Sequence, residues 1–343
     1  MIELNIITAF LTSMIALILL RSLAFKFNLI DYPTDRKDHT GNVPLVGGVS
    51  VFLGLLITYF FFIEFDKFSS VLLITGSLIL IHGIWDDFAN LKAKTKIAFQ
   101  ASLSAIMIYV TDVKLESLGN FFGISYPLEL GILSIPLTIV AVVALTNAIN
   151  MMDGLDGLAA CVVLLAIAGL ICFNLTIEFS PLTSILLAVA SALLPFIIFN
   201  ISPNPKLKVF LGDGGSLFLG YIISWALIYS AENIKSFTPS FALWCVAVPL
   251  FDFFTVIIIR LFEKRSLVIA SKDHIHHTLE KKGFSKLKIL LLIAFTGLLF
   301  LVVGKVIEDY FPTISLSIFI IIFLFYAFIR VFNLTKKKFK KRK

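Results

Sequence analysis

The sequence predicts an all-α polytopic membrane protein, and three observations support this fold class. Hydrophobic residues make up 59% of the 343 residues and charged residues only 15%, whereas soluble domains contain about 45 to 50% and about 25%. The mean hydropathy is +0.98, and apolar runs long enough to cross a bilayer recur along the chain. A soluble globular fold could not cover this much apolar surface, and intrinsic disorder requires the opposite composition.

A helix needs about 20 apolar residues to cross roughly 30 Å of hydrocarbon. The sequence contains about eleven runs near that length, and because they are continuous rather than alternating they favour helices over barrel strands. The links are short, so we expect one membrane domain over residues 1–343 with a basic tail at 333–343. The expected spans lie near Ile6–Leu23, Leu45–Ile63, Val71–Trp85, Ile97–Val110, Ile132–Leu145, Leu158–Phe173, Leu182–Phe199, Ser216–Ser230, Phe241–Ile259, Ile289–Val303 and Ile314–Val331.

Lysine and arginine residues predict the orientation. If the loops are assigned alternately to the two sides, all 29 of these residues lie on one side except Lys67, Lys114, Lys235 and Lys305. Cytoplasmic loops are enriched in basic residues, so we expect the N-terminus outside and the C-terminus in the cytoplasm. The basic tail then indicates contact with anionic membrane lipid. No nucleic-acid partner is expected, because no folded reader accompanies the basic residues.

Polar clusters gather on the expected cytoplasmic side. The third span ends in Asp86 and Asp87. Two adjacent carboxylates repel, so holding both at a membrane boundary requires compensating cations or a metal. Lys96, where the next span begins, could hold a phosphate as a point charge. A solvated helix end and a lysine that snorkels to the interface are the alternatives.

The fifth span runs into a second cluster, residues 147–157. At helical spacing Asn147, Asn150 and, one turn on, Asp153 share a face. Their oxygen atoms suit Mg²⁺ or Mn²⁺, and the two glycines of Asp153–Gly157 let the backbone approach a ligand. A polar helix terminus is the alternative.

The eighth span opens with Gly212, Asp213, Gly214 and Gly215. Glycines before a helix N-terminus form an anion cradle, and an Asp there can bridge to a metal that carries phosphates. A glycine-rich turn, with Asp213 as a helix cap, is the alternative. Asp252 lies inside the ninth span, where an ionisable group is functional by default, although a structural hydrogen bond explains it almost equally well.

The longest cytoplasmic loop carries Arg265 and then His274, His276 and His277. Zinc binding is disfavoured, because adjacent histidines project in different directions and no thiolate or H-E-x-x-H partner accompanies them. Phosphate binding beside Arg265 fits the acidic metal site better. A solvated loop is the alternative.

These motifs together resemble those of the polyprenyl-phosphate N-acetylhexosamine-1-phosphate transferases of bacteria, over nearly the whole chain. The resemblance includes the first cytoplasmic loop, in which Arg36 and His39 precede Pro44, Gly47 and Gly48; taken alone, that loop is a polar turn before a helix. It implies transfer of N-acetylglucosamine 1-phosphate from UDP-GlcNAc to undecaprenyl phosphate, with release of UMP and formation of a lipid-linked diphosphate sugar. It also implies a bacterial inner-membrane protein with a cytoplasmic active site that initiates synthesis of a cell-envelope polysaccharide.

The resemblance also implies roles for individual residues. It assigns Mg²⁺, which Mn²⁺ could replace, to two ligands, and substrate contacts or catalytic roles to the rest. By this resemblance the metal ligands are Asn150 and Asp213; the catalytic group is Asp86, Asp87, Asp153, Asp156, His274, His276 and His277; and the substrate-binding group is Lys96 for the diphosphate, Phe210 for the uracil ring, Arg265, Asn147, Arg36 and His39.

Several alternatives remain open at this stage. The first keeps the chemistry but takes UDP-MurNAc-pentapeptide as donor, although Ile275 between His274 and His276 is typical of the N-acetylhexosamine branch. The second is a membrane transporter, which is disfavoured because the polar motifs gather at one face and the sequence shows no repeat. A homodimer is left open. The stretch Ser266–Asp273 departs from the Ser-Pro-Phe run usual in this family.

Overall fold

A computed structural model gives the structure of the protein, which describes residues 2–33, 41–120, 126–174, 180–267 and 272–342. The described chain is almost entirely helical. Its α-helices are α1 (Ile2–Phe27), α2 (Gly47–Phe62), α3 (Lys67–Ala89), α4 (Ala93–Thr111), α5 (Ser134–Met152), α6 (Leu158–Asn174), α7 (Pro181–Asn200), α8 (Gly212–Glu232), α9 (Pro239–Cys245), α10 (Ala247–Phe262), α11 (Ile275–Glu280), α12 (Lys286–Tyr310) and α13 (Ser315–Arg342).

Each apolar run expected to form a span is helical in the structure, and the ninth contains the pair α9 and α10. Within the described residues, seven helices are long and apolar enough to cross a membrane. The pair α9 and α10 adds an eighth if it is counted as one span, although it is bent by 86°. The structure therefore confirms an all-α polytopic membrane protein. The count of eleven crossings and the orientation stay predictions.

Helix α8 forms the centre of the bundle, because 94% of its most apolar 18-residue stretch is buried. Helices α2 and α3 approach its first turn closely because glycines face each other there. A Cβ added to Gly48 would lie 2.1 Å from the Cα atom of Gly215, and one added to Gly83 would lie 2.4 Å from that of Gly214. No side chain fits in these contacts, so the glycines bring the end of α3 beside the start of α8.

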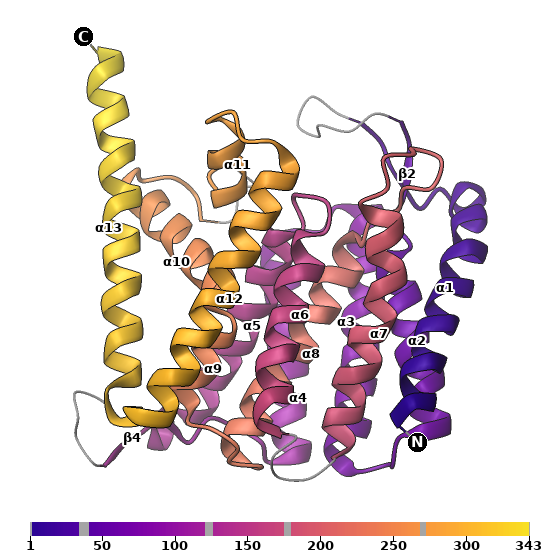
Figure 1. The fold of residues 1–343 in the computed structure, drawn as a ribbon, viewed down its shortest axis with the longest axis horizontal. Coiled ribbons are helices and arrows are strands. Elements are labelled where there is room, and N and C mark those ends of the chain that lie inside the picture. Colours follow the sequence, from indigo (N-terminus) through magenta and orange to yellow (C-terminus); the bar gives the residue numbers. More distant parts are fainter. Residues whose placement is uncertain (1, 34–40, 121–125, 175–179, 268–271, 343) are drawn as a thin grey trace.

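Two short hairpins lie at opposite ends of the bundle. Strands β1 (Ile30–Asp31) and β2 (Val43–Pro44) pair antiparallel at the end that also carries α11, whereas β3 (Ser117–Asn120) and β4 (Pro127–Glu129) pair antiparallel at the other end of the bundle (Figure 1). Backbone hydrogen bonds join the first hairpin to the segment before α8. The N–H of Phe210 donates to the carbonyl of Pro44, and the N–H of Gly47 donates to the carbonyl of Phe210, both at 2.9 Å.

Candidate active site

The paired carboxylates at the end of α3 have different partners. Asp86 is 3% exposed. Its Oδ2 lies 2.5 Å from Nζ of Lys96, and its Oδ1 accepts the backbone N–H of Leu91 at 2.8 Å. Asn90 adopts a left-handed φ of 48° at the end of α3, and this tight turn carries the chain back to α4 so that Lys96 faces Asp86.

Asp87 caps a different helix from its own. Its Oδ1 accepts the backbone N–H of Asp213 at 3.1 Å, and its Oδ2 accepts that of Gly214 at 3.5 Å. Gly212 has a φ of +77°, which favours glycine, and a Cβ at this position would lie 2.9 Å from Oδ2 of Asp87. Glycine is therefore the residue that fits where the chain enters α8. The capping role considered for Asp213 therefore belongs to Asp87, and the side chain of Asp213 is left for another function.

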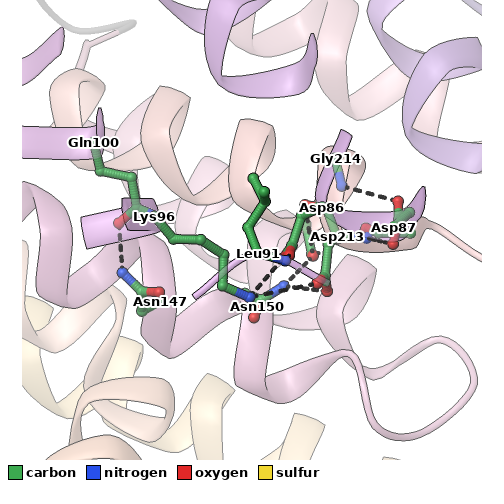
Figure 2. A network of polar contacts seen from close by, with 11 residues as sticks. Asp86, Asp87, Leu91, Lys96, Gln100, Asn147, Asn150, Asp213 and Gly214 are labelled. Carbon is green, nitrogen blue, oxygen red and sulfur yellow. Dashed lines mark hydrogen bonds and ion pairs between the residues drawn. The ribbon is translucent and has the colours of Figure 1, made fainter. Parts of the chain in front are cut away.

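Asp213 is the carboxylate of this cluster that is open to solvent, with its side chain 42% exposed. Asn150 Nδ2 donates to its Oδ1 at 3.0 Å and to the hydroxyl of Ser216 at 2.8 Å. Lys96 Nζ lies 4.0 Å from its Oδ2. Figure 2 shows Asp86, Lys96, Asn150 and Asp213 converging from four helices, so the structure brings these separated motifs into one cluster.

Asn147 lies beside the cluster but has a structural partner. Its Nδ2 donates to Oε1 of Gln100, one turn after Lys96 on α4, at 2.6 Å (Figure 2). Gln100 was not predictable as a partner from the sequence, because a glutamine inside an apolar run carries no charge and belongs to no motif. The pair joins α4 to α5, and so fixes the distance between Lys96 and Asn150.

The turn after α5 adds two carboxylates to the same end of the bundle. Burial raises the pKa of the Asp153 carboxyl well above its ordinary value, and nearby carboxylates, Asp213 first, raise it further. Asp156 forms an ion pair with Lys208, 2.6 Å between Oδ2 and Nζ. That ammonium lies 5.7 Å from the centre of the Phe210 ring. Lys208, which the sequence analysis had not assigned to the site, therefore links Asp156 to Phe210.

The histidine segment packs directly on this turn. A Cβ added to Gly154 would lie 2.4 Å from Nε2 of His276, so the imidazole rests on the backbone there. Burial, with a smaller contribution from the neighbouring His277, lowers the pKa of His276 to about 3. Neither ring nitrogen of His276 has a hydrogen-bond partner in the described structure. Two unpaired polar atoms in a buried ring indicate a position that a ligand would satisfy.

Other predicted residues are placed differently. Arg265 is paired with Glu263 and lies 3.0 Å from Oδ2 of Asp273, with its guanidinium partly exposed, so its charge is shared between two carboxylates. Arg36 and His39 lie outside the described residues.

The donor atoms around Asp213 suit a hard divalent cation. Among the described residues, no three His, Cys, Asp or Glu side chains lie together in a way that could hold a metal ion. Mg²⁺ is commonly held by one or two carboxylates together with substrate phosphates and water. The Asp213 carboxylate would supply one such ligand, and the side-chain amide of Asn150, which lies beside it, would supply an oxygen.

Comparison with known proteins identifies the family of the chain. The profile of Glycosyl transferase family 4 matches residues 69–231. The chain is 32% identical to the undecaprenyl-phosphate alpha-N-acetylglucosaminyl 1-phosphate transferase of Escherichia coli O157:H7, over 94% of this chain and 89% of that protein.

Two further relatives match over a similar extent. The protein of the same name from Yersinia pestis is 31% identical over 98% of this chain and 95% of its own length. The probable undecaprenyl-phosphate N-acetylglucosaminyl 1-phosphate transferase of Bacillus subtilis (strain 168) is 32% identical over 98% of this chain and 94% of its own length. The resemblance of the motifs is thus confirmed, and the chain belongs to the family of undecaprenyl-phosphate N-acetylglucosaminyl 1-phosphate transferases within glycosyl transferase family 4.

Proposed function

We propose that the protein transfers N-acetylglucosamine 1-phosphate from UDP-GlcNAc to undecaprenyl phosphate. An oxygen of the acceptor phosphate attacks the β-phosphorus of the donor, the bond to the bridging oxygen breaks, and UMP leaves. The product is undecaprenyl-diphosphate-GlcNAc, the first lipid-linked intermediate of a cell-envelope polysaccharide. The three relatives named above carry names for this reaction, and none is a muropeptide transferase.

One observation carries the proposal: Lys96 lies between Asp86 and Asp213, 2.5 Å and 4.0 Å from their oxygens, beside Asn150. Phosphoryl transfer requires placement in line and neutralisation of phosphate charge more than covalent help. The Lys96 ammonium supplies a fixed positive charge there. Asp86 holds that ammonium in position, and the half-exposed Asp213 faces the space where phosphates would lie.

The family implies a Mg²⁺ ion, which Mn²⁺ could replace, and Asp213 and Asn150 would hold it. When bound, the cation supplies additional positive charge to the donor diphosphate. The histidines would contact the diphosphate or the sugar, because His276 is buried, neutral and without a partner among the described residues. An acceptor phosphate is already a nucleophile near neutral pH, so direct attack needs no aspartyl intermediate. Both oxygens of Asp86 and of Asp87 are already engaged, so these carboxylates would act by holding Lys96 and the start of α8 in place.

We place this site on the cytoplasmic side of the bacterial inner membrane. The site lies at the end of the bundle that carries α11, and the loops expected on that side hold most of the basic residues.

Donor exchange tests the proposal. Purified protein in detergent, with Mg²⁺ and undecaprenyl phosphate, should transfer label from UDP-GlcNAc labelled at the β-phosphorus to the lipid fraction and release UMP. Reactions without the acceptor lipid serve as the control. Transfer from UDP-MurNAc-pentapeptide alone would assign the protein to the muropeptide reaction, and no lipid-linked product from either donor would contradict a transferase function.

A further inference from the structure

Asp252 is buried in α10 and contacts the histidine segment with both of its oxygens. Its Oδ2 lies 2.7 Å from Nδ1 of His274, and its Oδ1 accepts the backbone N–H of Ile275 at 2.8 Å. The residue is 0% exposed. A carboxylate inside a membrane bundle is costly unless it is paired, and this one faces neither Lys96 nor Asp213 in the cluster described above.

The charge that compensates Asp252 comes from the last helix. Arg330 of α13 places Nη1 3.4 Å from Oδ1 of Asp252 and 2.8 Å from the hydroxyl of Tyr326. Its side chain is 11% exposed. From the sequence, Arg330 was one of the basic residues that predict the orientation, but the structure shows it turned inward against α10.

The same guanidinium also contacts residues that precede and follow His274 in the chain. Nη2 donates to the carbonyl of Asp273 at 2.7 Å and lies 3.5 Å from the hydroxyl of Thr278. One planar group therefore connects the residue before His274, the first turn of α11 and Asp252. A lysine could not make this set of contacts, because its ammonium is a point charge without a planar fork.

The contacts determine how His274 is presented. Because a carboxylate only accepts hydrogen bonds, Nδ1 of His274 carries a hydrogen, and Nε2 is the acceptor in the neutral ring. The His274 ring is parallel to that of His276, with an interplanar angle of 8° and centroids 6.0 Å apart. His276 in turn rests on Gly154. A shift of His274 would therefore move the unpartnered His276 relative to the 153–157 turn.

We propose that Asp252 and Arg330 are positioning residues: together they hold the start of α11 so that His274 and His276 face the donor substrate. Neither residue contacts the reacting atoms. The inference rests on the proposed function for its kinetic readout, but its structural consequence can be measured separately.

The test uses the full-length protein with Arg330→Lys, Arg330→Gln and Asp252→Asn. We expect the KM for UDP-GlcNAc to rise about 10-fold or more in Arg330→Gln, since hydrogen bonds to charged groups are among the strongest in proteins. The KM for undecaprenyl phosphate should change less than about 2-fold, and Arg330→Lys should restore only part of the donor KM. Lys305→Gln is the matched control, because it removes the ion pair to Asp309 within α12, far along the chain from the histidine segment.

The double variant Asp252→Asn/Arg330→Gln tests whether the two residues act together. If the two residues act as one unit, the double variant should raise the donor KM little more than the worse single variant does. Fully additive effects would contradict a joint role. An unchanged donor KM in folded Arg330→Gln, or equal increases in both KM values with a lowered melting temperature, would also overturn the proposal, the latter in favour of simple anchoring of α13.

Hydrogen exchange separates this inference from the proposed function. The amide of Ile275 is bonded to Asp252, so Arg330→Gln should speed exchange in a peptide covering residues 272–280 and leave one covering 93–111 unchanged. If wild-type protein transfers nothing from UDP-GlcNAc while this local effect appears, the proposed function fails and the positioning role stands. Unchanged exchange at 272–280 would contradict the positioning role even in an active enzyme.

Discussion

Lys96 and Asp86 form a close ion pair across the α3–α4 turn, with 2.5 Å between Nζ and Oδ2. The Asp86 carboxylate is buried whereas the ammonium remains partly exposed, so the carboxylate serves to hold the charge of Lys96 at a fixed point beside Asp213. A lysine held in this way needs little reorganisation when a phosphate binds, which is the condition under which electrostatic stabilisation is most effective.

Lys96→Gln should therefore lower kcat about 100-fold or more, because the fixed charge next to the reacting phosphates is lost. The melting temperature should also fall, since the buried Asp86 loses its counter-ion and keeps only the Leu91 amide. Steady-state release of UMP measures the effect. Lys94→Gln is the matched control on the same helix, where Lys94 is exposed, and a comparable loss in that variant would contradict a specific role for Lys96.

The glycine contact between α3 and α8 gives a prediction about stability. Gly83→Ala places a Cβ 2.4 Å from Cα of Gly214, so the backbones must separate, and we expect a cost of about 1–3 kcal/mol or more. Activity should fall with it, because the same contact sets the distance from Asp87 to the start of α8. Thermal unfolding in detergent checks this. Gly76→Ala on the same helix is the control, since its nearest neighbour is the side chain of Phe218 at 3.2 Å; equal effects in both variants would contradict the argument.

The sequence predicted the helices well because their signal is local: a continuous apolar run specifies a membrane helix wherever it occurs. It did not predict the break between α9 and α10, which lies inside one apolar run. Pro249, in the first turn of α10, favours that break, because its backbone nitrogen carries no hydrogen that could be donated to the carbonyl of Cys245.

The motifs of the site were predictable, whereas their pairings were not. Asp156 with Lys208, Gln100 with Asn147, and Asp252 with Arg330 join residues far apart in sequence. Such pairs depend on which helices lie side by side, and no local pattern encodes that. The same reason explains why Asp213 could not be separated from a helix cap before Asp87 was seen to occupy the capping position.

His276 predicts how stability depends on pH. Its pKa is lowered to about 3 in the folded protein, and an unfolded histidine titrates near 6.5. Between these values the unfolded chain binds more protons, so this residue removes stability as the pH falls from about 6.5 towards 3. The melting temperature should drop less between pH 7.5 and 5 in His276→Gln than in the wild type. Identical pH profiles would contradict burial of a neutral His276.

The orientation can be tested by cysteine labelling in a variant without Cys161, Cys172 and Cys245. Ser285, before α12, should be shielded from an impermeant thiol reagent in intact cells when replaced by cysteine, whereas Lys235→Cys, after α8, should be labelled. Both positions are exposed, so access to the reagent is decided by the side of the membrane. Labelling of Ser285→Cys from outside would invert the topology and move the candidate site out of the cytoplasm.

The sharpest prediction concerns Asp213 as a metal ligand. Asp213→Asn keeps the size of the side chain, and the capping of α8 belongs to Asp87, so stability should change by about 1 kcal/mol or less. A cation site would lose a negative charge next to Asn150, and its affinity depends on the number of charged ligands. Turnover should fall by a factor of about 100 or more, and the Mg²⁺ concentration for half-maximal activity should rise. Chelation should abolish wild-type activity, and Mg²⁺ or Mn²⁺ should restore it.

Asp112→Asn, which replaces an exposed carboxylate paired with Lys114, is the control. Near-normal turnover with an unchanged metal requirement in Asp213→Asn would show that Asp213 does not hold the cation, and the ligand would then have to be sought among Asp86, Asp87, Asp153 and Asp156.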